Sequence, residues 1–251
     1  EINNSGHLHP PIEDHPFSIF PTIGNTERPD KVSTMLMEGR VVIFVSGDPV
    51  ALIAPYLFVE SFMNIEDYNS RPFYSTLIRL LRFGAFLISI VTPALYISAI
   101  NFNKALIPSD LIVPIIEERE TVPFPLSMEV LISFAMFEVV REAGVRLPQQ
   151  VGTAVSIVGP LILGDVAVTA GLIGAPTIIV VSLSYIAAFV ISTIADVTSL
   201  LRIYLFIAAS LFGTFGLCMG LLGLLTHMVS LTSIGIPYLS PLSPIHFKDL
   251  K

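Results

Sequence analysis

The chain of 251 residues is 53% hydrophobic and only 13% charged, which is outside the composition typical of soluble domains. Its formal net charge of −7, with most acidic residues in the first 150 positions, argues against nucleic acid as a partner. The single cysteine, Cys218, lies in an apolar stretch and excludes a disulfide framework or a thiolate metal site within the chain.

The first 30 residues are rich in Pro, Asn and His and predict an extended, irregular linker. Three histidines fall within it: His7, His9 and His15. No other ligand pattern lies nearby, so their spacing indicates a His-bearing linker rather than a metal site. The chain begins at Glu1 with neither Met nor a signal peptide, which indicates a fragment or a gene product cut at its front. A short helix is predicted over residues 31–38, ended by Gly39.

Two β-branched runs follow, at residues 40–45 and 50–55. They are separated by Ser46-Gly47-Asp48-Pro49 and predict a β-hairpin with a four-residue turn. A membrane span over residues 41–58 is the competing interpretation, but the Gly-Asp-Pro sequence in its middle argues against it.

Four long apolar runs without Lys, Arg or Glu dominate the rest of the chain: residues 83–100, 151–174, 176–195 and 203–225. A membrane span needs about 20 apolar residues to cross about 30 Å of hydrocarbon. The runs also lack the polar stripe that a helix at the surface of a soluble protein shows. They predict a mostly α, polytopic helical membrane protein, preceded by the short irregular segment with its β-hairpin. Four glycines give the last run a face of small residues: Gly213, Gly216, Gly220 and Gly223.

Residues 126–147 are long enough to cross a membrane but are charged. Glu138 with Arg141, and Glu142 with Arg146, have the spacing of neutralising helix pairs. The segment therefore either lies along the interface or crosses with its charged half facing protein or water. The chain then has four or five spans, and the distribution of arginines favours five by a small margin.

One face of the run at 151–174 is the candidate pore lining: Val158, Ile162, Asp165 and Thr169. Repeated around a symmetry axis, this face would place an apolar constriction beside a ring of carboxylates, which can gate by dewetting and favour cations. The alternative is that Asp165 bonds a Ser, Thr or Arg between helices of one subunit. A second face carries small residues for close helix packing: Gly152, Ser156 and Gly159.

Two further acidic groups are weighed as parts of a cation path. The first consists of Glu129, Glu138 and Glu142. The arginines beside them favour a solvated or salt-bridged face instead. The second consists of Glu117, Glu118 and Glu120, which could concentrate cations at a pore mouth but as a charge run favours a hydrated loop.

The sequence argues against an enzyme. An intramembrane aspartyl protease would need Asp165 and Asp196 to share a proton. On helices that reverse at residues 174–176, the depths of these two aspartates differ by about 16 Å. No nucleophile elbow, phosphate loop or zinc pattern occurs in the sequence, so no catalytic residue, cofactor or metal is predicted.

A series of separated motifs occurs in order along nearly the whole chain. They are Ile12-Glu13-Asp14, Pro16-Phe17-Ser18, Thr26-Glu27-Arg28-Pro29-Asp30, Glu38-Gly39-Arg40, Glu66-Asp67-Tyr68, Arg71-Pro72, Arg79-Leu80-Leu81-Arg82, Pro93-Ala94-Leu95-Tyr96, Pro123-Phe124-Pro125, Phe137-Glu138, Arg141-Glu142-Ala143-Gly144, Ser156-Ile157-Val158-Gly159 and Gly235-Ile236-Pro237-Tyr238-Leu239-Ser240-Pro241. In this order they resemble the A subunits of GerA-type spore germination receptors.

The resemblance implies a non-enzymatic subunit of a nutrient-sensing complex in the spore inner membrane. It implies that A subunits form a homo-oligomeric, pentameric cation channel that releases monovalent cations at the start of germination. The implied partners are a transporter-like B subunit, which binds the nutrient, and a C-subunit lipoprotein. Residues 1–72 would then end a cytoplasmic N-terminal domain, residues 73–231 would form the transmembrane domain, and residues 232–251 would begin the C-terminal tail.

Other functions remain open at this stage. A secondary transporter is disfavoured because no internal duplication is visible. A non-conducting membrane scaffold, or a paralogue that amplifies the germination signal, is also compatible with the sequence. Asp165 stands where the family pattern has Gln, so any role of this carboxylate is peculiar to this sequence.

Overall fold

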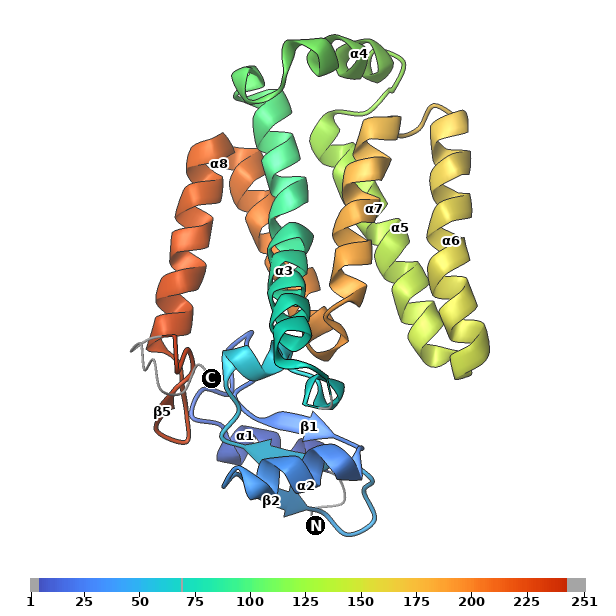
Figure 1. The fold of residues 1–251 in the computed structure, drawn as a ribbon. Helices are drawn as coiled ribbons and strands as arrows, with labels where there is room; N and C mark the ends of the chain where they lie inside the picture. The colour runs from blue at the N-terminus through green and yellow to red at the C-terminus, as the bar shows by residue number, and fades with distance from the viewer. Residues whose placement is uncertain (1–4, 69, 243–251) are drawn as a thin grey trace. The chain divides into compact units, whose positions relative to one another are not determined.

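The computed structural model describes residues 5–68 and 70–242. The chain is mostly helical, with a small antiparallel sheet near its N-terminus (Figure 1). It divides into two compact units: unit 1 comprises residues 1–83 and 222–251, and unit 2 comprises residues 84–221. Two long helices run from one unit into the other, α3 (Pro72–Asn101) and α8 (Ala195–Ser230).

Unit 1 contains a three-stranded antiparallel sheet in the order β1-β3-β2. The strands are β1 (Gly24–Thr26), β2 (Val41–Phe44) and β3 (Ala51–Ala54). All four residues of β3 are buried, because this central strand has a partner on each side. The β2–β3 pairing confirms the predicted hairpin, with a six-residue connection in which Gly47 has a φ of +91°. The third strand, β1, lies within the segment that the sequence predicted to be irregular.

The short helix α2 (Pro29–Met37) lies between β1 and β2. It confirms the helix predicted over residues 31–38. The chain turns away from the end of this helix at Gly39, whose φ of +82° would strain a residue with a side chain. Other short elements of unit 1 are a 3-10 turn at Ser5–His7, α1 (His9–Ile12), and 3-10 turns at Phe58–Phe62 and Ile65–Asp67.

The segment that follows the last helix also belongs to unit 1. Its two-residue strands, β4 (Thr232–Ser233) and β5 (Ile236–Pro237), pair as a hairpin. The Tyr238 carbonyl accepts a hydrogen bond from the Phe58 amide at 3.0 Å, and the Ser233 hydroxyl accepts one from the Tyr56 amide at 2.9 Å. The chain that enters α3 and the chain that leaves α8 are therefore bound together.

Unit 2 is a helical bundle. Besides parts of α3 and α8, it contains α4 (Ser109–Arg119), α5 (Leu126–Arg146), α6 (Gln149–Thr169) and α7 (Ala175–Phe189), with 3-10 turns at Lys104–Leu106 and Ser192–Ile194. Helix α5 packs along both α6 and α7. The segment at 126–147, which the sequence left between two placements, is thus a helix inside the bundle.

The direction of each helix follows from its contacts. Ser184 on α7 bonds to the Ser89 carbonyl on α3, whereas Thr177 on α7 lies 3.3 Å from the Tyr96 hydroxyl on α3, so α3 and α7 are antiparallel. Ser98 on α3 donates to Thr214 at 3.0 Å, and the Ser89 carbonyl accepts from Arg202, so α3 runs parallel to the first part of α8.

Helix α8 is not one continuous rod, because the chain turns back at Gly213 (Figure 1). This residue has a φ of +61° and a ψ of −140°, which is open to glycine alone. Beyond Gly213, Gly220 lies against the side chain of Leu205, which is fifteen residues earlier in the chain and on the other side of the reversal. The single last span predicted over residues 203–225 was therefore wrong: two antiparallel arms occupy that run. The glycine face lets these arms approach each other.

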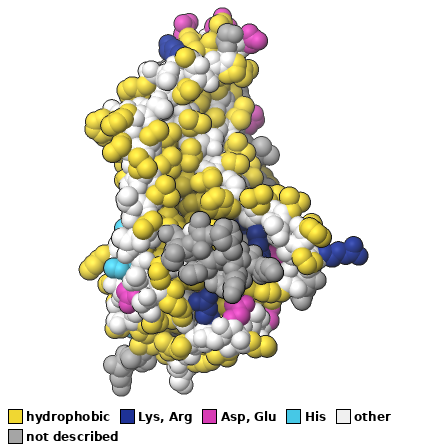
Figure 2. Space-filling model, turned by 60° about the vertical axis from the view of Figure 1, so that its left-hand side comes forward, with side chains coloured by type: hydrophobic (Ala, Val, Ile, Leu, Met, Phe, Trp, Pro, Cys, Tyr) yellow, Lys and Arg dark blue, Asp and Glu magenta, His cyan; other side chains and the backbone are white. Residues whose placement is uncertain are grey.

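By length and composition, two helices among the described residues could cross a membrane: α3, and α8 when its 36 residues are counted across the reversal at Gly213. Residues 158–169 of α6 and all of α7 form shorter apolar helices. The four or five spans predicted from the sequence are thus not confirmed as a number. In the view of Figure 2, hydrophobic side chains cover most of the visible helical surface, whereas acidic side chains gather at the end where α4 lies.

Candidate functional site

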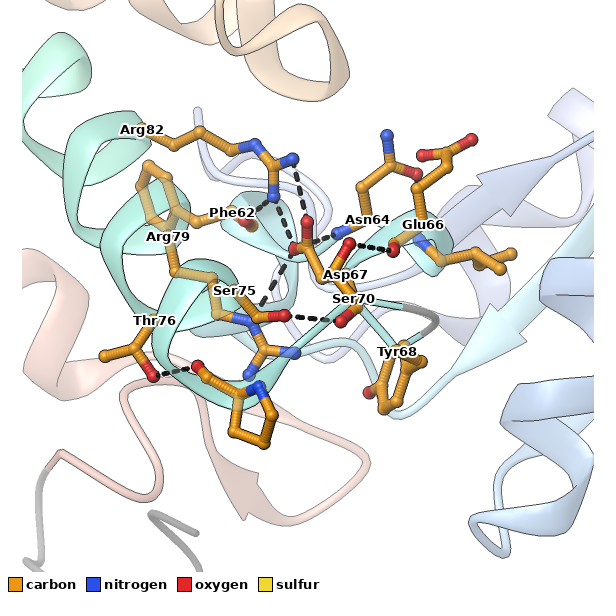
Figure 3. Close-up of polar contacts among 12 residues, drawn as sticks. Phe62, Asn64, Glu66, Asp67, Tyr68, Ser70, Ser75, Thr76, Arg79 and Arg82 are labelled. Atoms are coloured by element: carbon orange, nitrogen blue, oxygen red, sulfur yellow. Dashed lines mark hydrogen bonds and ion pairs between the residues drawn. The ribbon is translucent and has the colours of Figure 1, made fainter.

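A cluster of charged side chains in unit 1 fixes the start of α3 (Figure 3). Arg82 donates to both carboxylate oxygens of Asp67, at 2.5 and 3.0 Å, and to the Phe62 carbonyl at 2.9 Å. The Asn64 amide donates to the same carboxylate at 3.0 Å. The Asp67 side chain is 6% exposed and that of Arg82 is 17% exposed. Two motifs that carried the family resemblance therefore meet in one bidentate ion pair.

The same cluster extends to the surface. Arg79 lies 3.6 Å from the Asp67 carboxylate and stacks over the Tyr68 ring at 5.6 Å. Ser75 donates to the Asp67 carbonyl at 2.6 Å. Burial would raise the pKa of Asp67, but the bonds from Arg82 and Asn64 outweigh it and hold that pKa below its ordinary value. Asp67 is therefore ionised at neutral pH and ties the first turns of α3 to the chain that precedes them.

A second charged pair lies closer to the sheet of unit 1. Arg40 donates to the buried Glu60 carboxylate and to the Pro55 carbonyl. Burial raises the pKa of Glu60 to about 7, against the opposing charge of Arg40. The same environment, through burial, lowers the pKa of Lys31. The protonation of Glu60 therefore changes near neutral pH.

The pore-lining candidates lie on one exposed face of α6. The structure leaves four side chains on that face without cover from their own chain: Val158, Ile162, Asp165 and Thr169. No hydrogen bond or ion pair of Asp165 is found among the described residues. The alternative expectation, a bond from Asp165 to a neighbouring helix of the same subunit, thus has no support in this part of the chain.

The opposite side of α6 packs against the bundle. At Gly159, a Cβ atom would lie 2.8 Å from Val140 Cγ1 on α5, and at Gly152 it would collide with the Gly144 carbonyl. These two glycines therefore permit the close approach of α5 and α6. The third packing candidate, Ser156, has a side chain outside the described part of the structure.

Glu129 faces the interior of unit 2. Its side chain is 0% exposed and accepts hydrogen bonds from the Gly174 amide at 3.0 Å and from Thr177 at 3.1 Å. Arg119 lies 3.7 Å from its other oxygen. Glu129 thus caps the N-terminus of α7, where a negative charge is favourable. The second acidic residue at this helix end is Glu118, which accepts from the Ala175 amide at 3.1 Å.

The remaining acidic candidates are placed differently. Glu138 bonds Arg141 at 2.5 Å and also lies 3.2 Å from the Tyr185 hydroxyl. Arg141 in turn pairs with Asp196 on α8 at 2.9 Å. Glu142 pairs with Arg146 on the surface, as its spacing predicted. Glu117 and Glu120 are exposed on and beyond the last turn of α4.

Sequence reasoning missed Arg202. This residue stood between two apolar runs and served only as a charge for the orientation of the chain. In the structure it is 1% exposed, donates to the Ser89 carbonyl at 3.1 Å, and stacks on the Tyr185 ring at 3.9 Å. No carboxylate of the described residues lies within ion-pair distance of it. A signal for its burial did exist, since Arg202 is flanked by apolar residues on both sides.

No group of three or more His, Cys, Asp or Glu side chains that could hold a metal ion occurs among residues 5–68 and 70–242. His15 instead lies 3.5 Å from the Thr232 hydroxyl, and the adjacent Asp14 accepts from the same hydroxyl at 3.1 Å. The N-terminal segment is thereby attached to the β4–β5 hairpin. The side chain of His9 lies outside the described part.

Two compact units joined by long apolar helices, two of which are long and apolar enough to cross a membrane, indicate a helical membrane protein. A family model described as Bacillus/Clostridium GerA spore germination protein matches residues 1–251. The chain belongs to this family, which confirms the resemblance seen in its motifs.

Several curated relatives match over the full chain. Spore germination protein KA of Bacillus subtilis (strain 168) is 46% identical over 252 residues, covering 100% of this chain and 46% of that protein. Spore germination protein GerLA of Bacillus cereus is 40% identical, covering 100% and 51%. The uncharacterized membrane protein YfkQ of Bacillus subtilis (strain 168) is 42% identical, covering 100% and 49%. The chain thus spans about half the length of these relatives. No solved structure matches it.

Proposed function

We propose that this chain is the membrane part of a germinant receptor A subunit, and that several copies surround a cation channel that opens at the start of spore germination. The observation that carries the proposal is the exposed face of α6. A carboxylate on an apolar helix is unfavourable in contact with lipid and becomes tolerable where it faces water or a partner. Asp165 gains such surroundings when copies of α6 enclose a hydrated path.

The chemistry of that face fits a cation path. Val158 and Ile162 form an apolar stretch beside Asp165 and Thr169, so a ring of copies would combine a narrow apolar passage with a ring of negative charge. Glu129 and Glu138 take part in bonds inside one protomer, which makes them supports of the bundle rather than groups of this path. We propose a homo-oligomer, a pentamer in keeping with the resemblance, in the spore inner membrane.

Partners follow from the resemblance and belong to the same proposal. A transporter-like B subunit would bind the nutrient, and a C-subunit lipoprotein would complete the complex. The exposed apolar side chains of unit 2 offer surface for such contacts in the bilayer.

We further propose six membrane passes, formed by α3, α5, α6, α7 and the two arms of α8. The contacts within unit 2 make successive passes antiparallel, and at 1.5 Å per residue the shorter passes are about 22 to 32 Å long. An even number is supported because the start of α3 and the end of α8 both belong to unit 1. The test uses membrane-impermeant thiol labelling. Glu66→Cys and Ile234→Cys should label from one side and Glu117→Cys from the other; labelling of the first two from opposite sides would exclude an even number.

The channel is tested with the full-length protein in liposomes. We expect K+ currents, and we expect Asp165→Asn to lower the selectivity for K+ over Cl− or the conductance. Asp196→Asn is the matched control, because it removes an exposed carboxylate from α8. Unchanged currents in Asp165→Asn would remove the α6 face from the path. No current in the wild-type protein, together with a monomeric particle mass, would favour a scaffold.

A further inference from the structure

Apart from Thr22 Oγ1, unit 1 buries four side-chain oxygens that have no hydrogen-bond partner among the described residues. They are Tyr56 Oη, Glu60 Oε2, Ser61 Oγ and Tyr238 Oη. Each belongs to a residue at least nine-tenths buried, with exposed fractions of 2, 7, 3 and 0% respectively. A buried hydroxyl without a partner is rare in native proteins, because its bonds to water are lost and nothing replaces them.

These four groups lie close to one another. Burial raises the pKa of Tyr56 to about 12, and the Ser61 hydroxyl beside it opposes that shift. Burial likewise raises the pKa of Tyr238, with further contributions from Tyr56 and Glu60 and again an opposing effect of Ser61. The segments themselves are in contact, because the Phe58 amide donates to the Tyr238 carbonyl and the two rings lie 6.0 Å apart. The four groups therefore come together from separate segments of the chain: the segment after β3, the 3-10 turn at Phe58–Phe62, and the segment after β5.

We propose that Tyr56, Glu60, Ser61 and Tyr238 bind one buried water molecule, which joins the chain entering α3 to the chain leaving α8. A water molecule accepts two hydrogen bonds and donates two. The two phenol groups supply the donors, and the Glu60 carboxylate and the Ser61 hydroxyl supply the acceptors. Buried waters in proteins typically make about three such bonds.

A monovalent cation fits this site less well than water. It would take the oxygen lone pairs and leave the hydroxyl hydrogens directed into apolar surroundings, where the rings of Phe20 and Phe58 pack on Tyr238. In addition, the charge of Glu60 is already met by Arg40, and Lys31 contributes a second positive charge nearby. A neutral guest that both donates and accepts matches the site better.

The position of this water gives it a role in the architecture. The backbone bond from Phe58 to the Tyr238 carbonyl and the bond from the Tyr56 amide to Ser233 join the same two segments. The water completes this joint through side chains. It therefore contributes to holding the first and last membrane helices to one unit, whether or not the protein conducts ions.

The test compares the melting temperature of the full-length protein with that of Tyr238→Phe, which removes one hydroxyl and keeps the ring. If a water is bound, the variant loses a hydrogen bond and melts about 2–4 °C lower. If the site is dry, the variant sheds an unpaired hydroxyl and melts at the same or a higher temperature, which would overturn the proposal. Tyr68→Phe is the control, since its hydroxyl bonds the exposed Glu38.

Ser61→Ala provides a second variant should Tyr238→Phe fail to fold. Its melting temperature should also be lower than that of the wild type if a water is bound, and equal or higher if the site is dry. Replacing K+ and Na+ by choline at constant ionic strength should leave the melting temperature unchanged. A drop on removal of the small cations that is abolished in Ser61→Ala would assign the site to a cation and overturn the water. A double-mutant cycle of Tyr56→Phe and Tyr238→Phe should be non-additive, because both hydroxyls share one guest. Strict additivity would also contradict the proposal.

Discussion

Replacement of Asp67 by Asn removes one charge from the cluster that fixes the start of α3 and preserves the size of the side chain. Asp67 receives two hydrogen bonds from Arg82 and one from the Asn64 amide. In the variant, one carboxylate oxygen becomes an amide NH2 group, which faces the guanidinium as a second donor. We therefore expect Asp67→Asn to destabilise unit 1.

The size of the effect follows from burial. Removing one partner of a fully buried ion pair costs about 3–5 kcal/mol, whereas an exposed pair contributes about 0–1 kcal/mol. Asp67 is 6% exposed but Arg82 is 17% exposed, so we take the lower end of the first range, about 3 kcal/mol. For a chain of this size that corresponds to a fall of about 6–12 °C in melting temperature.

Circular dichroism at 222 nm is the suitable assay, because the chain is mostly helical and contains no Trp for fluorescence. Asp30→Asn is the matched control. Asp30 also forms a bidentate pair with an arginine, Arg28, but both partners are about half exposed. Asp30→Asn should therefore have the same melting temperature as the wild type. Equal melting temperatures for Asp67→Asn and Asp30→Asn would refute the argument that burial gives the Asp67 pair its strength.

Three other variants test separate features. For Glu60, burial raises the pKa of the folded state from 4.5 to about 7, so the folded state binds the proton more tightly than the unfolded state does. The free energy of unfolding should therefore fall by about 3 kcal/mol as the pH rises from about 4.5 to about 7. Glu60→Gln should remove this decrease when unfolding is measured as a function of pH. Gly213→Ala should destabilise by about 1–3 kcal/mol because its φ of +61° strains any side chain, while Gly84→Ala, with open space around it, should be neutral in the same thermal melts. Arg202→Met should leave the melting temperature unchanged or higher, because the buried guanidinium has no ion-pair partner among the described residues; a marked fall would show that its carbonyl and ring contacts outweigh its desolvation.

Local patterns predicted the elements whose causes are local. The helix that ends at Gly39 and the β2–β3 hairpin both follow from turn residues and β-branched runs that stand next to each other in the sequence. Strand β1 could not be predicted in this way. Its three residues, Gly24-Asn25-Thr26, have little strand propensity, and they are extended because they pair with the buried strand β3.

The reversal of α8 was hidden by a pattern that fits two structures. Glycines at positions 213, 216, 220 and 223 are typical of a face for close packing between helices. The same spacing also suits two arms of one helical hairpin, in which Gly216 approaches the Ala208 carbonyl. Only the backbone angles at Gly213 distinguish these cases, and no side-chain pattern specifies them.

The charged sites divide in the same way. Glu142 and Arg146 pair within one helix, so spacing predicted their contact. Asp67 and Arg82 are 15 residues apart, and Glu129 bonds the Gly174 amide 45 residues away. Such contacts depend on how helices and turns pack, so the motifs indicated which residues matter but not which partner each would have.

The two sides of α6 give a physical reason for the proposed association of several chains. One side is fully used within the protomer, since Gly159 packs on Val140 and Gly164 lies against Ile178 of α7. The other side exposes Asp165, which lies about one turn from the C-terminal end of α6. Its carboxylate would therefore cost less in contact with lipid than an aspartate at a helix centre, which costs about 3 kcal/mol, but the contact remains unfavourable. No described residue bonds this carboxylate, and in the proposed channel a hydrated path between copies would surround it. Each copy that moved its Asp165 from lipid to the proposed aqueous path would therefore gain free energy. The carboxylate that would attract cations would then also favour assembly of the ring.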